Sequence, residues 1–196
     1  NCPVIAATAQ KPETKVDTGT ATLGGPIVKN KLFFYGGWEQ TRRDLSSNSL
    51  ITVSPDVVAQ LGLKAQPTAV PNVQTAKFKI AKSEYQMNGA NRLTFRWIQF
   101  HNDAPYNSGG GLNTVERATD FLDAMDSFAG QAVTTIGNNK LNELRVQYAH
   151  RHQSSVANGD SGSGPAITIN GVAGFGAPLS GTGQGNAGFD FKQNIT

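Results

Sequence analysis

Hydrophobic and polar residues alternate along six segments of this chain, and these segments fall into three pairs. The pairs cover residues 21–42, 76–101 and 127–151, and each is interrupted by a short polar turn: "KNK", "NGAN" and "GNNK". Period-2 alternation with many Val, Ile, Thr and aromatic residues is typical of half-buried β-strands. The sequence therefore predicts three β-hairpins, with strands at 21–28, 32–42, 76–87, 92–101, 127–136 and 141–151.

The alternation separates an apolar face from a polar face in the best-defined strands. In "RLTFRW", Leu93, Phe95 and Trp97 share one side, and the arginines and Thr94 share the other. The sixth strand repeats the pattern, because Leu144, Val146 and Tyr148 alternate with Glu143, Arg145 and Gln147. In the third strand, Phe78 and Ile80 share one side. Strands with one apolar and one polar face are expected in a sheet that meets two different environments.

Long loops cover residues 43–75, 102–126 and 152–188. The first contains a short predicted helix that Ser54 can cap and Pro55 can begin, with an apolar stripe at Val57, Val58 and Leu61 and an end at Gly62. The second contains "GGG" and an acidic part, up to Asp126, with weak helical character. The third is rich in Gly, Ser and Asn around "AITINGVAGFG", and a seventh strand is expected near Phe189.

Short turns follow strands one, three and five, whereas long loops follow strands two, four and six. This order is typical of a transmembrane β-barrel, in which short turns lie on one side of the membrane and long loops on the other. A soluble β-sandwich also alternates but does not require this order. We predict an all-β fold: an antiparallel meander of six to seven strands, a segment of a transmembrane β-barrel with long Gly/Ser/Asn-rich loops. Residues 1–19 are expected to be an irregular lead-in, and 20–196 a partial barrel.

The composition supports a membrane-facing sheet. Hydrophobic residues make up 38% of the chain and charged residues only 16%, and the net charge of +3 is spread along the sequence. Scattered Lys and Arg do not suggest a nucleic-acid partner. The single cysteine, Cys2, excludes an internal disulfide and a cysteine metal site. The start "NCPVIAATAQK" lacks the pattern of a signal peptide, so we expect the chain to be a piece of a longer protein.

The segment "TLGGPIVKNKLFFYGGWEQTRR", residues 22–43, resembles the start of the barrel in TonB-dependent outer-membrane receptors, in particular the Oar-like group with a carboxypeptidase-regulatory-like N-terminal domain. The shared features are the "TLGGPI" strand, the lysine-rich turn and the aromatic strand with Gly36, Glu39 and Arg42; Trp38 replaces the usual Tyr. "NRLTFRW", "KLNELRVQYAHR" and "PAITINGVAGFG" resemble later parts of the family. The resemblance covers about residues 20–176.

The resemblance implies a location in the outer membrane of a Gram-negative type of bacterium and a parent protein that transports a ligand with energy from TonB. It implies lipid, TonB and an unknown ligand as partners, and no cofactor, metal or catalytic residue. The family's plug domain, TonB box and most barrel strands have no counterpart in this sequence, so the chain alone is not expected to transport anything. The alternative is a soluble β-rich binding or surface-active protein. A barrel segment alone would expose apolar faces and strand edges and should self-associate.

A serine hydrolase is a further alternative, because "NGDSGSGPA" is similar to the nucleophile motif of trypsin-like proteases, with Ser161 as nucleophile. A triad also needs a His base, for which the candidates are His101, His150 and His152. None has that family's sequence context, and Ser163 replaces the second Gly of the motif. "GQGNAG", residues 183–188, fits G-x-G-x-x-G but lacks the preceding strand and following helix of a dinucleotide site. We therefore expect no enzyme.

Three other groups of residues have both a functional and a structural interpretation. His150 and His152 could begin a zinc site, but a strand end exposed to solvent explains them better. Glu116, Asp120, Asp123 and Asp126 would share one face of a helix, where a solvated face is favoured over calcium binding. The aromatic residues could form a soluble core, or, in a barrel, contact lipid through Phe and the membrane interface through Trp and Tyr; they are Phe33, Phe34, Tyr35 and Trp38.

Overall fold

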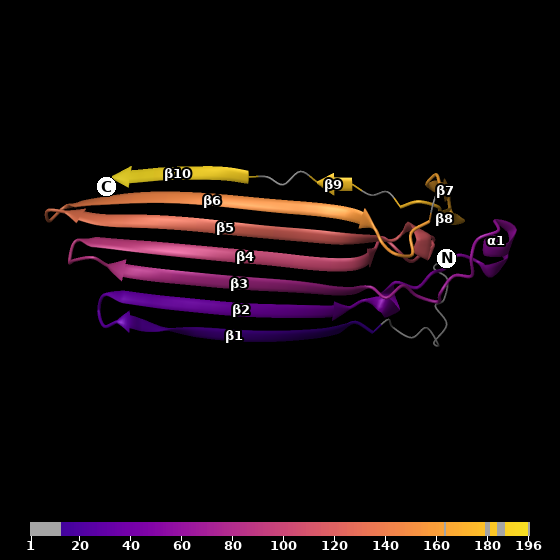
Figure 1. The fold of residues 1–196 in the computed structure, drawn as a ribbon, viewed down its shortest axis with the longest axis horizontal. Coiled ribbons are helices and arrows are strands. Elements are labelled where there is room, and N and C mark those ends of the chain that lie inside the picture. The colour runs from indigo at the N-terminus through magenta and orange to yellow at the C-terminus, as the bar shows by residue number, and fades with distance from the viewer. Residues whose placement is uncertain (1–12, 163, 179–180, 184–186, 196) are drawn as a thin grey trace, which may run out of the picture.

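The fold is one large, twisted antiparallel sheet that carries a small group of loops at one end (Figure 1). The computed structural model describes residues 13–162, 164–178, 181–183 and 187–195. Its long strands are β1 (Lys15–Val28), β2 (Leu32–Asp44), β3 (Val73–Gln86), β4 (Asn91–Asn107), β5 (Thr119–Ile136), β6 (Lys140–Ala157) and β10 (Ala187–Ile195). They are adjacent in the order β1-β2-β3-β4-β5-β6-β10, and β9 (Gly181–Gly183) also pairs with β6. The predicted antiparallel meander is confirmed.

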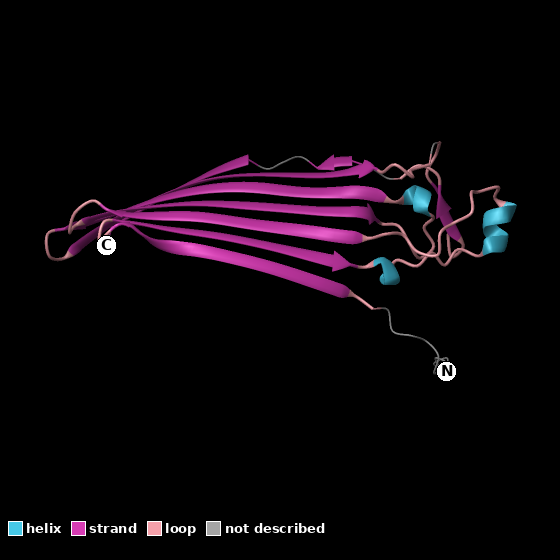
Figure 2. Ribbon diagram, turned by 60° about the horizontal axis from the view of Figure 1, so that its bottom comes forward, coloured by secondary structure: helices cyan, strands magenta, loops and turns pink. Residues whose placement is uncertain are grey.

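All three short turns lie at one end of the sheet, and the long connections lie at the other (Figures 1 and 2). In the first turn, Lys31 N–H donates to Val28 O at 3.0 Å, and Asn30 adopts a φ of 58°. Asparagine tolerates this left-handed conformation better than most residues, which makes "KNK" a suitable tight turn. The turn chemistry thus fixes this end of the first hairpin.

The sheet has two distinct faces, because residues directly opposite each other on neighbouring strands point to the same side. Leu93 on β4 pairs with Tyr85 on β3 and Ala132 on β5, and Phe95 occupies the next position on the same side. We call this side the apolar face; it carries Leu23, Phe34, Tyr85, Leu93, Phe95, Trp97, Phe128, Leu144, Val146 and Tyr148. Near the short turns the other side, the polar face, carries Lys82, Glu84, Arg92, Thr94, Arg96, Gln131, Glu143, Arg145 and Gln147. Closer to the long loops the same side carries Phe78, Ile80, Ile98 and Phe100, so the predicted alternation of Phe78 and Ile80 does not continue the apolar face.

The apolar face is largely uncovered. Leu23 is 70% exposed and Phe95 is 51% exposed, although both are large hydrophobic residues. Isolated exposed hydrophobic residues are common on soluble proteins, but a continuous apolar surface of this kind marks an interaction site. The sheet itself therefore offers one side to a non-aqueous environment.

The aromatic residues of β2 divide between the two faces. Phe34 and Trp38 lie on the apolar face, whereas Phe33 pairs with Glu84 and Tyr35 pairs with Lys82 on the polar face. The expectation that all four would contact a soluble core, or lipid and the membrane interface, is therefore wrong for Phe33 and Tyr35. The physical reason is the two-residue period of a strand, which sends consecutive side chains to opposite sides.

The strands extend further toward the long loops than the sequence pattern indicated. β1 begins at Lys15, within the segment expected to be irregular, and β5 begins at Thr119 instead of Ser127. Toward the short turns, the strand ends agree with the expected ones to within one residue. The outer parts of the strands carry polar residues on both faces, so alternation of hydrophobicity cannot reveal them.

The expected acidic helix before Asp126 is not formed. Only the short 3-10 turn η2 (Val115–Arg117) precedes β5, and the acidic residues that follow it lie on that strand. Asp123 is on the polar face, while Asp126 is on the apolar-face side, as their pairing with Asn102 and Gln99 shows. Strand pairing with β4 and β6 has overridden the weak helical preference of this segment.

The three long loops pack on one another at the end of the sheet. The predicted helix is present as α1 (Pro55–Gln60), preceded by Ser54 and, earlier, by the 3-10 turn η1 (Ser46–Asn48). The third loop contributes the hairpin of β7 (Ile167–Ile169) and β8 (Ala173–Phe175). A small core joins α1 to this hairpin; it is formed by Val53, Val58 and Ala173 with Ile51, Val57, Leu61, Leu63 and Phe175 around it. The second loop is attached through backbone bridges from Gly111 to Ile51 and from Asn113 to Gly174. We call this unit the loop cluster.

Gly176 should be required for the loop cluster. It has a φ of +85°, and a Cβ at this position would lie 2.1 Å from Pro165 O, whereas Gly171, with a φ of +72°, has open space around it. Backbone strain of this kind costs about 1–3 kcal/mol. We expect Gly176→Ala to raise the rate of proteinase K cleavage within the third loop about tenfold above that of Gly171→Ala. Equal cleavage rates in the two variants would contradict the close approach of Gly176 to Pro165.

Candidate functional site

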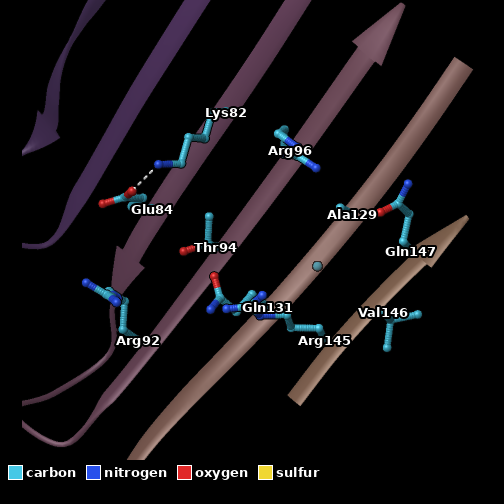
Figure 3. A pocket seen from close by; sticks show the side chains of 11 residues that line it. Lys82, Glu84, Arg92, Thr94, Arg96, Ala129, Gln131, Arg145, Val146 and Gln147 are labelled. Atoms are coloured by element: carbon cyan, nitrogen blue, oxygen red, sulfur yellow. Dashed lines mark hydrogen bonds and ion pairs between the residues drawn. The ribbon is translucent and has the colours of Figure 1, made fainter. Parts of the chain in front are cut away.

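A recess on the polar face combines four cationic side chains with neutral hydrogen-bonding groups, which makes it a candidate binding site. It lies between strands β3, β4, β5 and β6 near the short turns and has a volume of about 540 Å³ (Figure 3). Because its walls are strands, alternate residues from each strand point into it. Its side chains come mainly from Lys82, Glu84, Arg92, Thr94, Arg96, Gln131, Arg145 and Gln147.

The recess carries an excess of positive charge. Lys82 donates a hydrogen bond to Glu84, and Arg145 donates from Nε and Nη2 to Glu143 Oε1, at 2.8 and 2.6 Å. By contrast, Arg92 and Arg96 form no side-chain hydrogen bond or ion pair with any residue that the structure describes. The recess and its edge therefore contain four cationic side chains and two carboxylates, which leaves two guanidinium groups without a hydrogen-bonded carboxylate.

Sequence analysis did not identify this recess as a site. The alternation in "RLTFRW" placed Arg92 and Arg96 on one side of their strand, but it could not show which residues of other strands lie beside them. The strand register supplies this information, since Lys82 lies directly opposite Arg96, and Gln131 lies opposite both Thr94 and Arg145. The available signal was the pair Arg92 and Arg96, four residues apart and therefore on the same side of one strand.

A row of polar and aromatic residues marks the end of the apolar face that is nearer the long loops. Asp126 Oδ1 accepts hydrogen bonds from Trp97 Nε1 and Gln99 Nε2, both at 3.2 Å. Trp38 pairs with Lys79 in the same row. Tyr85, at the opposite end of the apolar face, lies six residues after Lys79 along β3, a distance of about 20 Å. This height is of the same order as the roughly 25 Å apolar band of outer-membrane barrels, which aromatic residues flank.

Ser161 does not meet a histidine base. Its Oγ lies 3.3 Å from Asn158 Oδ1, in a turn of the third loop. The recess beside it is lined by Lys64, Glu116, Asp160 and small residues, with no histidine among them. The histidines lie elsewhere: His101 on β4, and His150 and His152 on β6. The triad that the motif would need is therefore not assembled around Ser161.

The other motifs that fall on described residues are also not assembled into sites. No group of three or more His, Cys, Asp and Glu side chains in the described residues is suited to hold a metal. Asp123 is only 6% exposed and accepts from Arg151 Nε at 2.8 Å and Nη2 at 2.5 Å, and Asp120 accepts from Tyr106 N–H at 3.2 Å. The acidic residues thus have separate partners. The motif "GQGNAG" lies partly, and Cys2 wholly, outside the described residues.

No helix in the described residues is long and apolar enough to span a membrane.

One family model matches part of the chain. Residues 3–77, less than half of the chain, match the family model described as "Outer membrane beta barrel domain". This match covers the first hairpin, the first long loop and the start of β3. No curated protein and no solved structure matches the chain. The family match and the two-faced antiparallel sheet together show that the chain is an outer-membrane β-barrel protein.

Proposed function

We propose that the chain forms part of the barrel wall of a TonB-dependent receptor of the Oar-like group. In this proposal the parent protein moves a ligand across the outer membrane with energy from TonB, and the chain itself is not catalytic. The observation that carries the proposal is the sheet with an apolar and a polar face, short turns at one end and packed long loops at the other. The resemblance of residues 20–176 to that family directs it to this class of barrel.

The two faces suit the two sides of a barrel wall. The apolar face, with Phe34, Phe95 and Phe128, would contact lipid, because a lipid-facing surface favours large apolar side chains. The polar face, with its charged recess, would line the interior. The loop cluster would lie outside the cell, where it could meet a ligand first. TonB and the ligand are partners of the parent protein in this proposal.

A second candidate function is that of a surface-active protein in the absence of a membrane. The observation that favours it is the uncovered apolar face, together with the outer edge of β1, which pairs only with β2 among the described strands. Unpaired strand edges and exposed apolar surfaces promote association with interfaces and with other chains. The chain can have both properties, since the same face would contact lipid in the barrel.

Neighbouring phenylalanines on β2 allow a matched test of the two faces. We expect Phe34→Arg to lower the free energy of unfolding in a lipid bilayer by about 2–4 kcal/mol, because it would place a charge against the hydrocarbon. Phe33→Arg would place the same charge on the polar face opposite Glu84 and should cost less than about 1 kcal/mol. Urea titration in vesicles, followed by tryptophan fluorescence, measures both values. Equal losses would refute the assignment of the apolar face to lipid.

Retention on TonB tests the finer part of the proposal. The parent protein, extracted from outer membranes in a mild detergent, should bind to an immobilised periplasmic domain of TonB. An unrelated outer-membrane porin serves as the control and should pass through. A parent protein that is not retained would remove TonB from the proposed function, while leaving the barrel fold intact.

Behaviour without detergent tests the apolar face directly. We expect the purified 196-residue chain to elute from a size-exclusion column in plain buffer as oligomers or aggregates, because the apolar face has no lipid to cover it. In detergent micelles the same chain should elute as a single species. A monomer in plain buffer would show that the apolar face is covered by the protein itself.

A further inference from the structure

Two positive charges face each other across strands β3 and β4. Lys82 and Arg96 are directly opposite in the strand register, and like charges at such positions destabilise a sheet. Glu84 accepts a hydrogen bond from Lys82, but Arg96 has no acidic partner among the described residues. On its other side, Arg96 is opposite Ala129, which provides no charge. An additional negative group at this point would relieve the repulsion.

A second pair of cations lies at the other end of the recess. Arg92 lies two residues before Thr94 and Arg96 two residues after it, so all three side chains point to the polar face. Figure 3 shows Arg92 and Arg145 at one end, Lys82 and Arg96 at the other, and Thr94 between them. Arg145 is bound to Glu143, so Arg92, which interacts with the nearby Glu84 only through space, is the cation of this end without a hydrogen-bonded partner. The recess thus has two separate points that favour an anion.

The neutral side chains between these points can form hydrogen bonds. Thr94, Gln131 and Gln147 line the recess, and each has a donor that can reach an oxygen atom. Gln131 already donates to Glu143, and Gln147 donates to Ser127 Oγ at 3.3 Å, so their second amide hydrogens remain for a ligand. A volume of about 540 Å³ lies within the range of small-molecule sites.

We propose that this recess binds a small organic anion with at least two carboxylate or phosphate groups. One acidic group would lie between Lys82 and Arg96, and another would lie at Arg92. Guanidinium groups suit this role because their paired N–H donors match the oxygens of carboxylates and phosphates. A neutral sugar or an apolar molecule would leave both arginines unpaired. The inference rests on the polar face alone and does not depend on whether the parent protein uses TonB.

Calorimetric titration of the full chain in nonionic detergent micelles at low ionic strength tests this inference. Citrate and pyrophosphate serve as the probes, and they show whether carboxylate or phosphate is preferred; glucose serves as the neutral control. We expect both Arg96→Gln and Arg92→Gln to weaken binding about tenfold or more, since each removes a charge-assisted hydrogen bond to the anion. Arg96→Lys keeps the charge, so its affinity should lie between the affinity of Arg96→Gln and that of the unchanged protein.

Arg42→Gln is the matched control variant. Arg42 is opposite Thr75 on the same side of the sheet as the apolar face, close to the loop cluster. The change therefore removes one positive charge outside the recess. Its binding should stay within about twofold of the unchanged protein, and circular dichroism should show the same strand content in all variants. The inference is overturned if citrate and pyrophosphate bind no better than glucose, or if Arg42→Gln weakens binding as much as Arg96→Gln does.

Discussion

Hydrogen bonding between backbone groups is the constraint on which this structure depends. In hydrocarbon no water can satisfy an unpaired N–H or C=O group, so each strand that contacts lipid must be paired on both sides. Strands β2 to β6 meet this condition, because each lies between two neighbours with which it pairs in register over most of its length. The two faces, the short turns and the polar recess all follow from this continuous ladder.

The ladder also brings together residues that are far apart in the sequence. Antiparallel pairing of β3 to β6 places Lys82, Arg96 and Gln147 in one row, although more than sixty residues separate the first from the last. A one-residue change in the pairing of β4 would send its arginines to the apolar face and Leu93 and Phe95 to the polar one. The same register therefore places the apolar residues on one face and assembles the polar recess on the other.

Much of the fold could be predicted from the sequence, because the strongest signals are local. Alternation in "RLTFRW" and turn residues such as Asn30 identify strands and their ends near the short turns. The outer strand ends, such as Lys15 and Thr119, could not be predicted, since polar residues there lie on both faces and leave no period. The division of Phe33 and Phe34 between the faces follows from the strand period. Because the neighbouring residues are also aromatic, the segment shows no alternation between apolar and polar residues that would reveal this division. The recess required the register of four strands, which no local pattern contains.

The hydrogen bond from Trp97 to Asp126 has a consequence for the height of the loops. A carboxylate on the lipid side is costly in hydrocarbon, so Asp126 must stay in the headgroup region and the barrel cannot sink deeper. β5 runs seven residues from Asp126 to its outer end at Thr119, which is about 24 Å. The strands thus continue past the Asp126 row and place the loop cluster beyond the lipid headgroups.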